Sequence, residues 1–446
     1  MRNGTLRRRA AARLACALGA LLVAALARAD QAPVADEAFA VHGQATYVEQ
    51  ETSGFHAPYR GTNSLSPDQG RETFDATVDV GARLWSGAEG WLSGEVDQGF
   101  GLDDTLGLAG FPSGEAYKVG RKRPYLRLPR AFVRDTVELG GAALAREPGP
   151  TQLGGGGRAD RLVVTVGKFS VGDLFDTNQY AHDPRADFMN WTAIDAGTFD
   201  YAADAWGYTV GAALEWYQGA YTLRGGAFEL SNVPNSAHLE PGGHEFQIVA
   251  ELEHRHELGG EPGRLLVTGF ESRGRMALLD EATAVALANN GSVDLATLRR
   301  LRSRFGAHLT LEQALGPELG AFARAGGAAG NVETYEFTDV DHALAAGLSL
   351  KGTRWGRPGD TVGLAAMRNA LSAARQRYLA AGGLGILVGD GRLPHAGAEA
   401  IVESYYAAAV GPAAAVTLDY QYVTNPAFNR DRGPVSVFAL RLHAQF

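Results

Sequence analysis

The chain has 446 residues, of which 45% are hydrophobic and 20% charged, and its formal net charge at pH 7 is −9. After residue 29 it contains no apolar run long enough for a spanning helix, which excludes a helical membrane protein. An acidic exported chain is also not a nucleic-acid binder. Glycine accounts for 58 residues, roughly twice its usual share. This composition still fits a membrane barrel, whose strands alternate lipid-facing and lumen-facing residues.

Residues 1–29 have the three parts of a secretory signal peptide. Arginines at 2, 7, 8, 9 and 13 form the positive region, residues 14–26 form the apolar stretch, and Ala27-Arg28-Ala29 is a small-x-small cleavage site. The apolar stretch is shorter than the ~20 residues that an uncleaved anchor needs. Cleavage removes six Arg, no acid and the only cysteine, Cys16, so the mature chain 30–446 carries a net charge of −15. Acylation of Cys16 is a weaker alternative, because this residue lies at the start of the apolar stretch.

Alternation of apolar and polar residues recurs along the mature chain in segments of about ten residues or more. Val78 and Val80 share one face of such a segment, and Thr77 and Asp79 share the other. A period of two is typical of a β-strand with one apolar face. The clearest segments lie at 39–47, 74–84, 206–216, 344–351, 416–422 and 438–446.

Short and long joints alternate between these segments. Short links are predicted near 86–89, 218–219, 258–262, 316–317, 352–358 and 411–412. Long segments are predicted near 51–70, 101–123, 170–205, 231–243, 275–302, 371–396 and 425–433, with short helices at 279–300 and 371–383. Two joints break the rule: the Gly-rich stretch 140–159 is long where a short turn is expected, and 331–338 is modest where a long loop is expected. The pattern predicts one all-β domain, a transmembrane antiparallel up-and-down barrel of about 16 strands with an open pore.

The last strand ends on Phe446. Counting back from it, Ala444 and Leu442 share its face, and Gln445, His443 and Arg441 lie on the other. An aromatic residue at the very end of a long strand is the end found in outer-membrane barrels. We therefore expect Phe446 to be recognised by the barrel-assembly machinery, and the outer face to contact outer-membrane lipid.

Several segments resemble one family, the carbohydrate-selective porins of the bacterial outer membrane. The most specific segment begins with Gly167-Lys168-Phe169 and continues to Phe188-Met189-Asn190-Trp191. Weaker matches are Phe55-His56-Ala57-Pro58-Tyr59, Gly110-Phe111-Pro112-Ser113-Gly114, Asp419-Tyr420-Gln421-Tyr422 and Arg441-Leu442-His443. The resemblance implies a sixteen-stranded barrel that passes sugars such as glucose by diffusion. The insert at 146–158 is not part of it, and no function is attached to that insert.

The 170–205 segment is the third long joint, and in general porins the third external loop folds inward and narrows the barrel. Its polar side chains are suited to sugar hydroxyls, and its aromatic rings to the C–H face of a pyranose. The alternative is a loop that packs on itself, with Asp183 and Asp187 pairing locally with Arg185 and with Phe188 and Trp191 as anchors. The predicted constriction residues of the loop are Asp173, Asp176, Asn178, Asp183, Arg185, Asp187, Asn190 and Trp191.

On the barrel wall, strand parity places Arg83, Arg130 and Arg134 on the inner face. A guanidinium is always charged and presents five donors, so it can hold two adjacent hydroxyls or pair with loop acids across the pore. The alternative is a solvated charge in a wide lumen. Arginines facing an acidic loop would create a transverse field that favours neutral dipolar solutes.

Three other classes remain as alternatives. An enzyme would need a nucleophile and a base, and the sequence has no G-x-S-x-G or H-E-x-x-H motif. A general or anion porin would want a longer ladder of Lys and Arg than the cluster of arginines at 83, 127, 130 and 134 provides. An adhesive barrel with a filled lumen fits a smaller strand number. No cofactor or metal is expected; acidic loops could hold Ca²⁺, but none has the spacing of a calcium motif. The barrel could act as a monomer or as a homotrimer.

Overall fold

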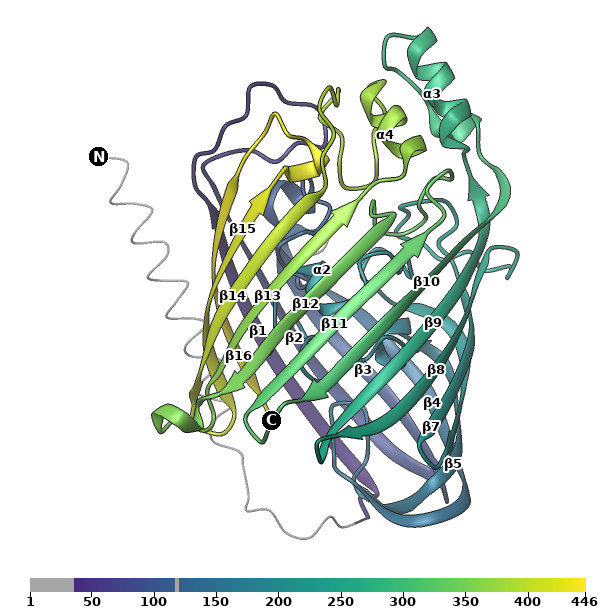
Figure 1. The fold of residues 1–446 in the computed structure, drawn as a ribbon. Coiled ribbons are helices and arrows are strands. Elements are labelled where there is room, and N and C mark those ends of the chain that lie inside the picture. Colours follow the sequence, from purple (N-terminus) through teal and green to yellow (C-terminus); the bar gives the residue numbers. More distant parts are fainter. Residues whose placement is uncertain (1–35, 117–119) are drawn as a thin grey trace.

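The computed structural model describes residues 36–116 and 120–446, and within them the chain forms a closed antiparallel barrel in which each strand pairs with its sequence neighbours and β1 pairs with β16 (Figure 1). The fold class predicted from the sequence is thereby confirmed. The predicted signal peptide lies outside the described residues. The strands are β1 Phe39–Thr52, β2 Gln69–Trp85, β3 Ala88–Gly99, β4 Arg121–Arg146, β5 Gly155–Phe169, β6 Thr209–Gln218, β7 Tyr221–Glu229, β8 Phe246–Leu258, β9 Glu261–Met276, β10 Arg300–Ala314, β11 Leu319–Ala328, β12 His342–Lys351, β13 Thr361–Ala370, β14 Glu399–Val410, β15 Ala414–Thr424 and β16 Val435–Gln445.

The long connections all emerge at one end of the barrel, here called the loop end, and the short ones at the other, the turn end (Figure 1). This segregation is the one predicted from the alternating joints. The two predicted helical segments are also confirmed, because α3 and α4 lie in long connections at the loop end. The helices are η1 Leu102–Thr105, η2 Val171–Asp173, α2 Trp191–Ile194, α3 Leu279–Ala288, η3 Leu295–Thr297, η4 Gly352–Trp355, α4 Ala373–Ala380 and η5 Pro426–Phe428. In the described part of the chain, none of the helices has the length and apolarity needed to cross a membrane.

The two faces of the wall differ as the alternation predicts. On β2, Val78 and Val80 are 47% and 38% exposed on the outer face, whereas Thr77 and Asp79 are buried on the inner face. One predicted segment is corrected: β6 begins at Thr209, so Trp206 and Tyr208 belong to the preceding loop. Tyr208 is buried under the guanidinium groups of Arg127 and Arg130 and does not face outward.

The Gly-rich stretch is long because two strands continue through it. β4 and β5 pair as far as Arg146 opposite Gly155, beyond the last pairs that β4 makes with β3 and β5 makes with β6. Only residues 147–154 form the connecting turn. Figure 1 shows this hairpin extending past its neighbours at the turn end and curving beneath the barrel.

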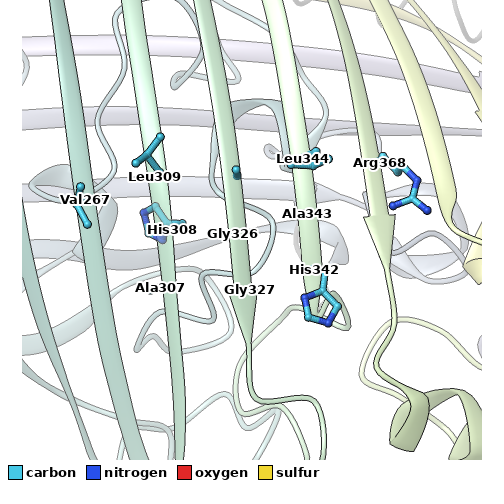
Figure 2. A pocket seen from close by; sticks show the side chains of 11 residues that line it. Val267, Ala307, His308, Leu309, Gly326, Gly327, His342, Ala343, Leu344 and Arg368 are labelled. Carbon is cyan, nitrogen blue, oxygen red and sulfur yellow. The ribbon is translucent and has the colours of Figure 1, made fainter.

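A hollow of about 600 Å³ lies across β9 to β13 (Figure 2). Its rim residues Val267, Leu309 and Leu344 are all more than 40% exposed and belong to the outer face. This hollow therefore opens on the lipid-facing side of the wall. The predicted constriction therefore has to be sought inside the barrel.

Candidate transport constriction

The connection between β5 and β6, residues 170–208, lies inside the barrel, and we call it the constriction loop. Its residues 188–203 are all buried. Side chains and backbone groups of this loop bond to the inner faces of β2, β4, β8, β10, β11, β14, β15 and β16. A segment tied to so many strands has one position relative to the wall.

Asp176 anchors the first half of the loop. Its carboxylate accepts hydrogen bonds from Thr310 Oγ1 at 2.6 Å and Arg324 Nε at 3.3 Å, and from the Ala196 backbone N–H at 2.6 Å. Burial opposes its charged form, but Arg324 and His308 more than offset this and hold the pKa of Asp176 below its usual range. A buried carboxylate with these partners fastens the loop to β10 and β11.

Asn190 and Trp191 anchor the second half. Asn190 caps α2 by accepting from the Thr192 N–H at 3.0 Å, and its amide donates to Gly110 O at 3.0 Å and to Gln421 Oε1 at 2.9 Å. The Trp191 ring stacks on Phe111 with 5.3 Å between ring centroids. Both side chains are at most 3% exposed. This half of the loop is thus packed against both the wall and the β3–β4 connection.

Arg441 on β16 holds the tip of the loop through backbone carbonyls. Its guanidinium donates to the carbonyl oxygens of Pro184 at 2.5 Å, Asp187 at 2.8 Å and Ala186 at 2.9 Å. Three carbonyls turned toward one buried cation fix the path of residues 184–187. The alternation along the last strand puts Arg441 on the face opposite Phe446, and these contacts show that this face points inward.

The tip itself carries Arg185, whose side chain reaches acids of the wall and of the β3–β4 connection. Its guanidinium lies 3.0 Å from Asp75 Oδ1, 3.5 Å from Glu95 Oε2 and 3.2 Å from Glu115 Oε2. The side chain keeps 17% of its surface exposed. Arg185 is therefore a cation that pairs with Asp75 and Glu95 of the wall and with Glu115 of the β3–β4 connection, at a point that keeps some exposure to solvent.

Asp183 and Asp187 flank Arg185 but do not form side-chain ion pairs with it in the described structure. Asp183 is exposed and accepts from the Arg185 backbone N–H at 2.9 Å, whereas Asp187 accepts from the His182 and Asp183 N–H groups. Burial, followed by the nearby charge of Asp183, raises the pKa of Asp187 to about 6. In place of the local ion pairs that the sequence leaves open, Arg185 pairs with Asp75 and Glu95 of the wall and with Glu115 of the β3–β4 connection.

Arg130 and Asp173 form a second polar pair at the base of the loop. The Arg130 Nε and Nη2 atoms donate to the two carboxylate oxygens of Asp173 at 2.8 and 2.6 Å. Asp173 also accepts from the Ser170 N–H at 3.0 Å. Burial opposes ionisation, but Arg130 more than offsets it and lowers the pKa of Asp173. This two-pronged pair remains partly exposed, at 16% for Arg130 and 24% for Asp173.

Two ionic arrays on the wall were not predicted. On β6 to β8, Arg224 lies within 3.1 Å of Glu215, Glu251 and Glu253. On β9 and β10, Arg264 Nε and Nη2 donate to the carboxylate of Glu312 at 2.6 and 2.8 Å. Carboxylates spaced two apart on one strand, such as Glu251 and Glu253, were the available signal, because such residues share the lumen face.

Arg83 and Arg134 occupy a different place from the one predicted. Both are on the inner face, but both bind segments at the turn end: Arg134 Nη1 donates to Glu89 Oε1 and Thr151 O, and Arg83 Nε donates to Glu37 O. Parity gives the face of a strand and not the height along the barrel. These two arginines are therefore removed from the set around the constriction loop.

The remaining predicted residues divide by exposure. Asp176, Asn178 and Asn190 are buried and hydrogen-bonded, and Trp191 is buried and stacked on Phe111, so we assign all four to anchoring, the alternative that the sequence leaves open. Arg130, Asp173, Asp183, Arg185 and Asp187 keep exposed surface near the loop. Across residues 36–116 and 120–446, no group of three His, Cys, Asp or Glu side chains is placed to hold a metal ion.

A closed sixteen-strand barrel narrowed by an internal loop with facing charges defines a porin. The chain belongs to the OprB family of carbohydrate-selective porins, whose model matches residues 62–446.

A solved structure with a TM-score above 0.5 agrees with this chain at the level of the fold. The high-pH structure of OprB from Pseudomonas putida has a TM-score of 0.68 and 16% identity, over 92% of this chain and 94% of that one. Its low-pH structure has a TM-score of 0.49 and 13% identity, over 91% and 92% of the two chains. The outer-membrane channel DcaP of Acinetobacter baumannii has a TM-score of 0.49 and 12% identity, over 92% and 97%. No curated protein sequence matches the chain.

Proposed function

We propose that this protein mediates passive, selective diffusion of sugars, such as glucose and related mono- and oligosaccharides, across the outer membrane of a Gram-negative bacterium. The observation that carries this proposal is the partly exposed Arg185 at the tip of the constriction loop, set among Asp75, Glu95 and Glu115. Membership of the carbohydrate-selective family supports the substrate class. The family consists of channels, so transport and not catalysis is the activity to test.

The pair Arg185 and Asp183 supplies both kinds of hydrogen-bonding partner at the tip. The Arg185 guanidinium offers planar donors, and the exposed carboxylate of Asp183 offers acceptors. A passing sugar exchanges part of its hydration for these groups, and the adjacent Arg130–Asp173 pair offers the same combination at the base of the loop. Because the contacts are few and shared with water, binding stays weak enough for release.

Charge arrangement, more than total charge, supports neutral substrates. The guanidinium groups of Arg127 and Arg185 face acids of β3 and β2 across short distances, and Arg130 faces Asp173 of the loop. Charges of both signs thus face one another across the lumen, and they create a local transverse field that acts on the dipole of a neutral solute. A net charge of one sign would instead concentrate counter-ions.

A liposome-swelling assay on the refolded protein, residues 30–446, tests the proposal. Glucose should enter faster than gluconate, an anion of similar size, and replacing Asp183 and Arg185 together by Ala should reduce the glucose rate. Arg368→Ala is the matched control, because Arg368 is exposed on the outer face. Equal rates for glucose and gluconate in the unmodified protein would leave a general or charged-solute porin as the function.

The outer surface suits the other partners expected from the sequence. Exposed apolar side chains on the outer face, such as Val80, Leu252 and Leu418, would contact outer-membrane lipid. Phe446 is 50% exposed beside the paired end of β1, where we propose that the barrel-assembly machinery recognises it. The turn end would then face the periplasm, and the loop end the outside. Sedimentation in detergent distinguishes a monomer from a homotrimer.

A further inference from the structure

The Gly-rich and Pro-rich insert, to which the sequence attached no function, forms a compact turn at the turn end. Gly149 and Gln152 exchange two backbone hydrogen bonds of 3.0 and 3.1 Å around Pro150 and Thr151. The Gln152 side chain donates to Glu147 O at 2.7 Å. Residues 147–154, which we call the periplasmic turn, therefore have a defined conformation of their own.

The periplasmic turn is bound to side chains of the inner wall. Thr151 O accepts from Arg134 Nη1 at 2.8 Å, and the Leu153 N–H donates to Glu89 Oε2 at 3.0 Å. Arg134 and Glu89 also pair with each other at 2.9 Å. Both belong to inward positions of β4 and β3, because Phe132 and Trp91, two residues away on the same faces, are buried. The turn thus lies on the lumen side of the wall.

An apolar contact fixes the same position. Leu153 is 2% exposed and belongs to the buried apolar cluster that contains Trp91 and Phe132. A turn that projected into the periplasm without contacting the wall would leave the Leu153 side chain exposed to water. Burying the leucine side chain removes apolar surface from water, which favours the folded-in position.

The segment before β1 closes the turn from the other side. Glu37 accepts from the Gly154 N–H at 2.7 Å and its own N–H donates to Gly154 O at 3.1 Å, while Asp36 accepts from the Gly156 N–H at 3.0 Å. Arg83 Nε donates to Glu37 O at 3.1 Å and so ties this segment to β2. Gly155 has a φ of 155°, and an added Cβ there would lie 2.5 Å from Asp36 Oδ1. The absence of a side chain at Gly155 therefore leaves room for the Asp36 carboxylate.

We propose that the periplasmic turn, clamped by Glu37, Arg83, Glu89 and Arg134, is a second constriction in series with the constriction loop, at the periplasmic mouth of the channel. That the turn end faces the periplasm rests on the proposed function. The second constriction gives Arg83 and Arg134 a role, since they hold the turn and do not contact the sugar at the constriction loop. Conductance is then limited at two heights of the barrel.

Cysteine modification tests whether the turn lies in the conduction path. Gln152 is exposed at the turn, and after signal cleavage the chain has no other cysteine, so Gln152→Cys provides a single reactive thiol. In planar bilayers with KCl, a cationic methanethiosulfonate should change the conductance of this variant about twofold and shift selectivity toward anions. Ala142→Cys, on an exposed part of the β4–β5 hairpin, is the matched control and should show no change.

A second variant removes the turn. Replacing residues 148–153 by Asn-Gly keeps a hairpin between β4 and β5 and should raise the KCl conductance by roughly one-half or more. Complete labelling of the Gln152→Cys variant without a change in current, or an unchanged conductance after turn replacement, would overturn the second constriction. Because both readouts use KCl, they are independent of glucose selectivity, whose failure would show only in the swelling assay.

Discussion

Arg185→Ala is the most informative single change to the constriction. Its guanidinium lies within 3.5 Å of Asp75, Glu95 and Glu115, so its loss leaves these carboxylates without their shared cation. The net charge at the narrow part of the lumen then becomes more negative by one. We expect the channel to change from weakly selective to clearly cation-selective.

The size of the change follows from Coulomb's law. A monovalent ion that passes ~7 Å from the missing charge gains or loses about 0.6 kcal/mol at a dielectric constant of 80, and about 2.4 kcal/mol at 20. Screening at 0.1 M salt, with a Debye length of ~10 Å, roughly halves these values. With ~0.7 kcal/mol for each ion, the cation is favoured and the anion disfavoured, and the permeability ratio rises roughly tenfold.

The assay is the reversal potential across a planar bilayer with unequal KCl on the two sides, at pH 8. Arg185→Lys is the control, because it keeps the charge and loses the planar fork. It should keep the reversal potential near that of the unmodified protein while glucose swelling falls. An Arg185→Ala channel whose reversal potential equals that of the unmodified protein would refute the position of Arg185 in the ion path.

The remaining predictions concern the anchors and one titrating group. Arg441→Met should release the carbonyls of residues 184, 186 and 187 and give larger, noisier single-channel currents. The barrel should still migrate as a folded band in unheated gels. Arg368→Met, on the outer face, is the control and should leave the currents unchanged. Asp176→Asn should leave Arg324 buried without a counter-charge and lower the free energy of unfolding by about 3 kcal/mol in a denaturant titration, and a change below ~1 kcal/mol would contradict its anchoring role. Because the pKa of Asp187 is raised to about 6, the folded protein holds this proton more tightly than the unfolded chain, whose Asp pKa is ~3.9, so stability should fall as pH rises from about 4 to about 6. As the pH rises through about 6, where Asp187 of the folded protein loses its proton, cation selectivity should rise. Asp187→Asn should weaken both trends, and an identical pH profile of the reversal potential in the variant would exclude Asp187 as their source.

Local sequence was sufficient for the architecture. Val78 and Val80 against Thr77 and Asp79 predict a strand with a lipid face and a lumen face, and repetition of that pattern gave the strand number. The alternation of short and long joints predicted that the long connections would lie together at one end of the barrel and the short ones at the other. These properties depend on a period of two and on chain length between strands, and both can be read along the chain.

The place of the constriction loop was also predictable, because its order among the long joints and its resemblance to a known family both pointed to residues 170–205. The sequence did not predict which residues of the loop anchor it and which remain exposed. Asp176 and Asp183 look alike in sequence, yet Asp176 meets Arg324 and Thr310 on strands more than 130 residues away. Only the closed barrel brings these partners together.

Height along the barrel is the other property that tertiary structure decided. Parity correctly placed Arg83, Arg130 and Arg134 on the inner face, but only Arg130 reaches the constriction loop. The other two meet Glu37, Glu89 and Thr151 at the turn end, because β4 and β5 continue beyond their neighbours and fold back under the wall. The sequence by itself determines which face of a strand a residue occupies; the tilt, the register and the packing of the closed barrel determine what that residue touches, since those depend on every other strand at once.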